Sequence, residues 1–196
     1  MTKSNVREKI LDAAFTLFYK GGIHATGIDR VVEEASVTRM TLYRHFPSKH
    51  ELVLAVLTRR DQQWMDWFKG RIETLATTPH ERLLAIYDAL GEWFHQEDFY
   101  GCAFINAAAE FSEIEHPAHC LASNHIRAVR DYIYELCVSS GASEAESLST
   151  RLSLTAEGAI VLAYVMGDRE CGTQAKEAAR ILLEAHGLKT TAWIEV

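Results

Sequence analysis

Basic and hydrogen-bonding side chains are concentrated in one short segment of the sequence, between Thr38 and Lys49. An arginine carries two parallel donors that match the O6 and N7 acceptors of guanine in the DNA major groove, and a threonine hydroxyl bonds to either kind of base edge. Arg39, Thr41 and Arg44 are therefore candidates for contacts with base edges. Such contacts require a rigid element that holds the side chains at groove depth.

The residues before this segment have the pattern of a short helix followed by a turn. Apolar residues recur at helical spacing from residue 28 to residue 35, and the turn falls at residues 35–37. Thr26 is expected to cap this helix, and Asp29, three residues later, suits a capping box.

A second short helix is expected over residues 39–45. Thr38 is a good N-cap for it. Leu42 and Phe46 are four residues apart, so both are expected to point inward. The long polar side chains of this helix are then left on its outer face, as in a helix that enters a major groove.

The segment VTRMTLYRHFPSKHEL, residues 37–52, resembles the helix-turn-helix signature of the TetR family of transcriptional regulators. The run Thr-Leu-Tyr-x-His-Phe-x-x-Lys, residues 41–49, is its most specific part. The motif covers about the first quarter of the chain, and length and helical layout agree over the whole. Two positions depart from the family pattern. Ser36 replaces a turn glycine that must tolerate a left-handed conformation, and Met40 replaces a frequent glycine and adds bulk near the bases.

The resemblance implies how this segment meets double-stranded DNA. The counterparts of Tyr43, His45 and Lys49 hold phosphates in TetR-like proteins, and Thr26 can do the same through its hydroxyl and the helix N-terminus. For Thr41 the alternative is a purely supporting role beside Tyr43, and Arg44 can instead meet only phosphate. The expected DNA-binding residues are Thr26, Thr38, Arg39, Met40, Thr41, Tyr43, Arg44, His45 and Lys49.

Charge divides the chain into a basic head and an acidic body. The 196 residues carry a net charge of −7. Residues 1–60 hold ten Lys and Arg against six Asp and Glu, a net of +4, and the remainder carries −11. This asymmetry is typical of a protein that meets phosphate at one end.

Composition favours a globular protein in a reducing compartment. Apolar residues make up 48% of the chain and there are only three prolines, which favours helices. The four cysteines show no Cys-x-x-Cys spacing, and the polar N-terminus is unlike a secretory signal. The longest apolar run, residues 158–167, is too short to cross a bilayer. A cytoplasmic protein with no membrane partner is therefore expected.

The sequence predicts an all-α fold of about nine helices. A three-helix helix-turn-helix DNA-binding domain is expected over residues 1–47, followed by a helical bundle for ligand binding and dimerisation over residues 48–196. Outside the helix-turn-helix pair, helices are expected at about 5–20, 48–71, 80–96, 101–111, 118–139, 143–166 and 173–186.

The last two expected helices carry more apolar residues than one core face needs. Surplus apolar surface on sequential helices predicts burial against a second copy of the chain. A single helix-turn-helix unit reads only a short half-site, so a homodimer on a near-palindromic operator is expected. The resemblance implies a regulator of transcription, with repression as the expected effect.

The resemblance also implies a small organic effector held between the middle helices. Its entry would shift the population between states with different DNA affinity. A mostly apolar cleft with a few polar groups suits such a ligand. The alternative for aromatic residues at helical spacing is ordinary core packing. The candidate ligand-binding residues are Trp67, Tyr87, Phe104, Asn106, Glu110 and His125.

A metal-binding helical bundle or enzyme with a basic N-terminal module is the competing hypothesis. The Glu-x-x-His spacing of di-iron bundles occurs at residues 92–95 and 113–116. However, His95 is expected beside the apolar stripe of its helix, and His116 is expected in a loop. Neither motif is therefore expected to face a bundle interior.

A second metal-like group is also present, but its adjacent members diverge on a helix. It consists of His116, His119, Cys120 and His125. Cys102 lies at an expected helix N-terminus, where a thiolate is favoured, so a redox role for it stays open. The sequence contains no glycine-rich phosphate loop, G-x-S-x-G or H-E-x-x-H motif. We therefore predict no catalytic residue, no metal and no cofactor.

Overall fold

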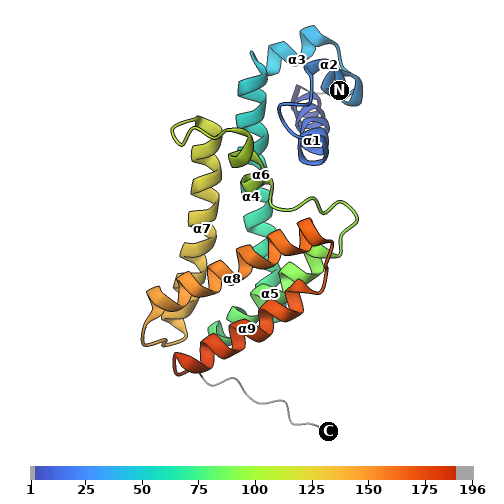
Figure 1. Cartoon of the computed structure of the whole chain (residues 1–196). Coiled ribbons are helices and arrows are strands. Elements are labelled where there is room, and N and C mark those ends of the chain that lie inside the picture. Colours follow the sequence, from blue (N-terminus) through green and yellow to red (C-terminus); the bar gives the residue numbers. More distant parts are fainter. Residues whose placement is uncertain (1–2, 189–196) are drawn as a thin grey trace. The chain divides into compact units, whose positions relative to one another are not determined.

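The computed structural model describes residues 3–188, and over this range the chain forms nine helices and no strand (Figure 1). The predicted all-α fold of about nine helices is confirmed. The helices are α1 (Lys3–Gly21), α2 (Ile28–Glu34), α3 (Arg39–His45), α4 (Lys49–Leu75), α5 (Pro79–Phe94), α6 (Ala103–Glu110), α7 (Pro117–Ser139), α8 (Ala145–Met166) and α9 (Cys171–Ala185).

Side-chain caps explain why several helices begin where they do. The Thr38 hydroxyl accepts the backbone N–H of Thr41 at 3.1 Å, which confirms the predicted cap of α3. The Ser48 hydroxyl accepts the N–H of Glu51 at 3.1 Å at the start of α4. Each cap satisfies a donor that the first helical turn leaves without a partner.

The chain divides into two compact units. The first comprises residues 3–63 and 102–126 of the described chain, so it contains α1, α2, α3, α6, the first part of α4 and the start of α7. Its core includes Ile10 and Leu11 of α1, Leu42 of α3 and Leu52 of α4, all fully buried. Because α1 packs against α2 and α2 packs against α3, this core braces the α2–α3 pair. The functional boundary between residues 47 and 48 stays a prediction.

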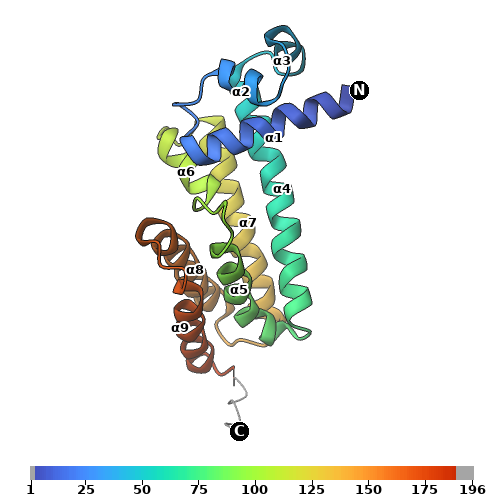
Figure 2. The same cartoon turned by 90° about the vertical axis from the view of Figure 1, so that its right-hand side faces the viewer.

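The second unit comprises residues 64–101 and 127–188 of the described chain. In it α9 packs against both α5 and α8 (Figure 2). A Cβ added at Gly172 of α9 would lie 2.7 Å from the Cα of Gly91 in α5, so the two backbones approach as closely as glycine allows. The Tyr87 hydroxyl donates a hydrogen bond to the Leu152 carbonyl at 2.9 Å and ties α5 to α8.

Candidate nucleic-acid interface

The turn between α2 and α3 contains a serine in the left-handed backbone region. Ser36 has φ +51°, the only positive φ of a non-glycine residue in the described chain. The turn closes through hydrogen bonds from Ala35 N–H to the Val31 carbonyl and from Val37 N–H to the Val32 carbonyl. The sequence-based expectation of a left-handed conformation at this position is confirmed, and Ser36 bears the strain that glycine would avoid.

The two faces of α3 differ sharply in exposure. Leu42 is fully buried and Phe46, just past the helix end, is 3% exposed, as predicted. Met40 is 75% exposed and Tyr43 is 41% exposed. Because the apolar face is buried and α3 packs against α2, the outer face is the one that can meet another molecule.

Arg39, the first residue of α3, is paired with a carboxylate of α2. Its Nη2 lies 3.0 Å from Oδ1 of Asp29 and donates to Oδ2 at 3.1 Å. Both side chains are mostly exposed, at 61% and 80%. Sequence reasoning assigned Asp29 only to a helix cap and missed this pair.

Thr41 and Thr38 interact through their hydroxyl groups, whose oxygens lie 2.8 Å apart. Thr41 is half-buried, and its backbone N–H also bonds to Thr38. Thr41 therefore has an internal partner in Thr38, and a base contact by its hydroxyl would compete with this hydrogen bond. The supporting role beside Tyr43 stays a prediction.

The expected phosphate-contacting residues lie at the end of α3 and the start of α4. Tyr43 and Arg44 are exposed and His45 is half-buried. Lys49 Nζ donates a long hydrogen bond of 3.4 Å to the His24 carbonyl, which points the ammonium group toward the α1–α2 loop. Their contacts with DNA stay predictions.

The prediction that Thr26 caps α2 is wrong. The cap position is Gly27, which makes no side-chain cap hydrogen bond. Thr26 is fully buried, and its hydroxyl donates to the carbonyls of Gly22 at 2.7 Å and Leu17 at 3.3 Å. Because its hydroxyl bonds to α1 and the following loop, it is not available to a phosphate in this conformation.

The six candidate ligand-binding residues are divided between the two units. Trp67 and Tyr87 belong to the second unit, where Tyr87 is 1% exposed and Trp67 lies 6.5 Å, ring centre to ring centre, from Trp93. Tyr87 packs as a core aromatic, the alternative kept open above, whereas Trp67 is half-buried. Their role in binding a ligand stays a prediction.

Phe104 and His125 form one contact pair in the first unit. Their rings stack with centres 3.8 Å apart, and His125 Nδ1 lies 2.7 Å from Oδ1 of Asp61. His125 is only 3% exposed. Burial lowers the pKa of this imidazole, although Asp61 acts in the opposite direction. The pair ties α6 to α7 and α4.

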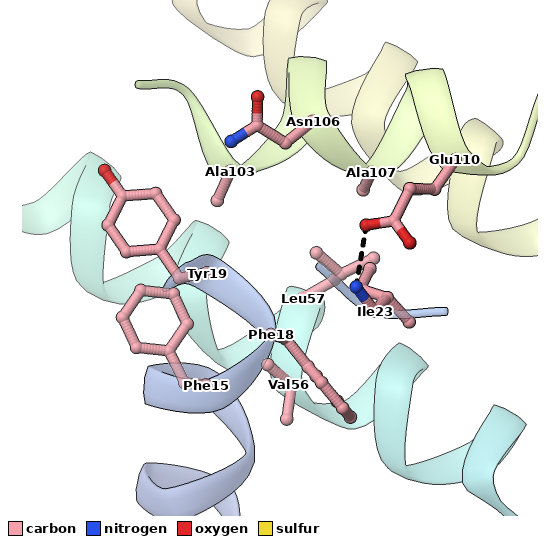
Figure 3. A pocket seen from close by; sticks show the side chains of 10 residues that line it. All are labelled: Phe15, Phe18, Tyr19, Ile23, Val56, Leu57, Ala103, Asn106, Ala107 and Glu110. Atoms are coloured by element: carbon pink, nitrogen blue, oxygen red, sulfur yellow. Dashed lines mark hydrogen bonds between the residues drawn. The ribbon is translucent and has the colours of Figure 1, made fainter. Parts of the chain in front are cut away.

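Asn106 and Glu110 do line a common cavity, which lies among α1, α4 and α6 in the first unit (Figure 3). Its volume is about 20 Å³, which is room for about one water molecule. Its wall is mostly aromatic and aliphatic. The lining residues are Phe15, Phe18, Tyr19, Ile23, Val56, Leu57, Ala103, Asn106, Ala107 and Glu110.

Glu110 ends α6 and binds the loop that leads into α2. Its Oε1 accepts the Ile23 N–H at 2.7 Å (Figure 3). Its Oε2 accepts the His24 N–H at 2.6 Å and lies 3.0 Å from His24 Nδ1. Desolvation would raise the pKa of Glu110, but the hydrogen bonds from the His24 and Ile23 amides outweigh it and lower the pKa. We call these three contacts the Glu110 clasp.

A larger groove that sequence reasoning missed lies in the second unit. Its volume is about 590 Å³, within the range of small-molecule sites. Lys176 Nζ and Asp88 form an ion pair at 2.7 Å in its wall. The lining residues are Leu75, Ala76, His80, Glu81, Leu84, Ala85, Asp88, Thr173, Lys176, Glu177 and Arg180.

The Glu-x-x-His pairs are not arranged as metal ligands. Glu92 accepts two hydrogen bonds of 2.6 Å from Arg71, and His95 Nδ1 lies 2.8 Å from the Gly91 carbonyl. His116 stacks on Phe111 with ring centres 4.3 Å apart.

The second metal-like group is likewise dispersed. His119 Nδ1 lies 2.8 Å from the Phe111 carbonyl, the Cys120 thiol donates to the Ile114 carbonyl, and His125 faces Asp61. Among residues 3–188 no group of three or more His, Cys, Asp or Glu side chains is placed to hold a metal ion.

Burial affects the cysteine thiols. Over residues 3–188 the four cysteines form no disulfide, and Cys102, at the cap of α6, is buried. Burial raises the pKa of the Cys137 thiol to about 12, which keeps it protonated at neutral pH.

None of the helices in the described part of the chain combines the length and the apolar character that a membrane span requires.

Helix α3 follows α2 after a tight turn, buries its apolar face and exposes polar side chains on its outer face. This arrangement defines a helix-turn-helix protein of the DNA-binding class. Residues 10–56 match the family described as "Bacterial regulatory proteins, tetR family". This match identifies residues 10–56 as the DNA-binding segment of the TetR family of transcriptional regulators.

Similarity to known members extends beyond the helix-turn-helix unit. A TetR-family transcriptional regulator from Streptomyces coelicolor superposes with a TM-score of 0.87 at 29% identity, over 93% of this chain and 96% of that one. The HTH-type transcriptional regulator YjdC of Escherichia coli is 28% identical over 154 residues, 79% of this chain and 81% of YjdC. The HTH-type transcriptional repressor KstR of Mycolicibacterium smegmatis is 31% identical over 130 residues, 64% of this chain and 63% of KstR.

Proposed function

We propose that this TetR-family protein is a ligand-responsive repressor that binds a near-palindromic DNA operator as a homodimer and is released by a small organic effector. The observation that carries the proposal is the α2–α3 pair, whose buried face is fixed by Leu42 and Phe46 while Met40 and Tyr43 stand exposed on the other side. Repression is the activity in the name of KstR. Acting on chromosomal DNA, the protein would work in the cytoplasm.

The proposed division of labour follows residue chemistry. Arg39 and Arg44 donate to base edges, and Met40 makes apolar contact beside them. Tyr43, His45 and Lys49 hold phosphates and fix the register of α3 in the groove. In this scheme residues 1–47 carry the helices that read DNA. Residues 48–196 bind the second copy and supply α4 and α6 to the effector cavity, which α1 also borders.

The proposed dimer interface consists of α8 and α9. Exposed apolar side chains recur on α8 at helical spacing, where Leu154 is 69% exposed, Val161 42% and Val165 72%. On α9, Ile181 is 60% exposed. An exposed apolar surface of this kind favours burial against another molecule, and an isologous contact between copies buries both at once.

The effector is proposed to act in the first unit, at the cavity that Asn106 and Glu110 line. The cavity is too small for an organic molecule as it stands, so entry of a ligand must separate α6 from α1 and α4. Glu110 at the end of α6 holds Ile23 and His24 in the loop before α2. Binding there would therefore strain the Glu110 clasp and move α2 and α3, which lowers DNA affinity by population shift.

The DNA-binding proposal is tested by selecting random duplexes on the purified protein and measuring Kd on the selected sequence at several salt concentrations. We expect an inverted repeat and a steep loss of affinity with salt, because each neutralised phosphate adds about 0.9 to the logarithmic slope. Lys49→Ala should weaken binding to all duplexes and reduce the slope by about 1. Arg39→Ala should lose discrimination at one base pair. An unselective protein, or one with a flat salt response, would refute the proposal.

The effector proposal is tested separately. A thermal-shift screen of small organic molecules identifies a ligand that releases DNA, and hydrogen exchange then locates it. Altered exchange in α6 and the α1–α2 loop supports the assignment. Protection confined to the α5–α9 groove of the second unit would refute the cavity among α1, α4 and α6 as the effector site.

A further inference from the structure

An exposed ion pair joins α2 to α3, and the small stability that such a pair adds to the fold does not account for its geometry. Arg39 Nη2 meets both carboxylate oxygens of Asp29, at 3.0 Å and 3.1 Å, although the two side chains are 61% and 80% exposed. Exposed pairs of this kind contribute little to folding. The pair also joins the first residue of the helix that faces DNA to the helix before it.

A carboxylate in this place opposes DNA binding on electrostatic grounds. Residues 1–60 carry a net charge of +4, which attracts phosphate, and an anion beside Arg39 reduces that attraction. The Asp29 carboxylate therefore does not raise the affinity for DNA of every sequence.

We infer that Asp29 is a specificity-determining positioning residue, which orients the guanidinium group of Arg39 toward a base edge. The inference rests on the proposed role of Arg39 in base reading. A guanidinium has five N–H donors in a rigid planar plate. Asp29 holds one nitrogen from the α2 side, so the orientation of the plate is fixed while donors remain for guanine.

The expected consequence is a larger difference in binding affinity between the correct base pair and the other base pairs. A free arginine side chain loses conformational freedom when it makes two parallel hydrogen bonds, and it also adapts to other acceptors. An arginine already held in the productive orientation loses less on binding, which strengthens the two-donor contact with guanine. Asp29 thereby sharpens discrimination at the base pair that Arg39 contacts, and it does so without touching DNA.

Two other roles for Asp29 predict different measurements. As an acidic residue in the first turn of α2, it stabilises that helix through the helix dipole. Its loss would then lower the Tm and weaken binding to every duplex alike. As a simple repulsive charge, its loss would strengthen binding to every duplex alike.

The test compares Asp29→Asn, Arg39→Ala and the double variant on the selected operator and all its single-base-pair variants. Glu33→Gln is the matched control, because Glu33 is an exposed carboxylate on the same helix. Arg39→Ala should reduce discrimination at one base pair on the order of tenfold. Asp29→Asn should reduce discrimination at that same base pair at least several-fold, and should add nothing in the Arg39→Ala background. Glu33→Gln should shift all affinities together.

The outcomes separate the inference from the proposed function. If Arg39→Ala relaxes one position and Asp29→Asn leaves the profile unchanged, the inference is wrong while base reading by Arg39 stands. If Asp29→Asn behaves as Glu33→Gln does, the carboxylate is only a repulsive charge. If Arg39→Ala changes no preference, both the base-reading role of Arg39 and the positioning role of Asp29 are refuted.

Discussion

Removal of the Glu110 clasp should destabilise the first unit by an amount that its hydrogen bonds predict. In Glu110→Ala the Ile23 N–H loses its acceptor, and Ile23 is only 5% exposed. An unsatisfied buried donor costs about 1–3 kcal/mol. The His24 N–H is more exposed and can turn to water, so its loss costs about 0.5–1.5 kcal/mol. We expect the free energy of unfolding to fall by about 2–4 kcal/mol.

The measurement is chemical and thermal denaturation together with amide hydrogen exchange. A loss of this size corresponds to roughly 4–16 °C in Tm for a chain of this length, and exchange should accelerate first at Ile23 and His24. Glu110→Gln keeps one carbonyl oxygen as an acceptor and should lose about half as much. Glu113→Ala, which removes the same charge from an exposed position nearby, serves as the control.

The stability that the Glu110 clasp adds should also depend on pH, in a direction that the pKa of Glu110 sets. The pKa of Glu110 in the folded protein lies below its ordinary value of 4.5. The clasp therefore stabilises the fold above that ordinary value, and this stability is lost as the pH falls through the folded pKa. If Glu110→Ala melts as the native protein does, with unchanged exchange at Ile23 and His24, the reasoning about the clasp is refuted.

Three further substitutions follow from backbone strain, from α8 and from burial. Ser36→Gly relieves a left-handed conformation that costs about 1–2 kcal/mol, partly offset by about 0.5–1 kcal/mol of glycine entropy; thermal melting should show a small gain, and a lower Tm contradicts it. Gly158 lies exposed in α8 with no atom within 4 Å of an added Cβ, so Gly158→Ala should favour the helix by about 0.5–1 kcal/mol. If two copies pack there, the same methyl group should weaken dimerisation in sedimentation experiments, and unchanged or tighter association rejects close packing at Gly158. Burial raises the pKa of Glu157 to about 7, so its proton stabilises the fold at low pH and that stability is lost between about pH 4.5 and pH 7. Glu157→Gln should therefore raise the free energy of unfolding at pH 8 much more than at pH 5, and an equal effect at both pH values contradicts the burial argument.

Local chemistry was enough to predict the α2–α3 pair from sequence. The Thr38 cap, the inward side chains of Leu42 and Phe46, and the left-handed Ser36 all depend on neighbours within a few residues. Spacing and capping rules act over that distance, which is why these expectations are confirmed.

Long-range contacts account for what the sequence did not predict. Glu110 and Ile23 are 87 residues apart, so no local pattern indicates that the carboxylate binds backbone amides before α2. The prediction that Thr26 caps α2 was wrong for a related reason. Its type suits a cap, but burial against α1 makes it a donor to the Gly22 and Leu17 carbonyls instead. Similarly, the aromatic and hydroxyl groups of Tyr87 would suit a ligand pocket, but its side chain is buried in the core.

The most direct test of the account is hydroxyl-radical footprinting of the selected operator, with the stoichiometry of the complex measured in parallel. Two chains per operator should protect two equivalent patches on one face of the duplex, about 34 Å apart. Exposed methionine and tyrosine at positions 40 and 43 should be shielded in the reciprocal protein footprint. A single protected patch, one chain per duplex, or an α3 that remains fully reactive in the complex would contradict the central claim.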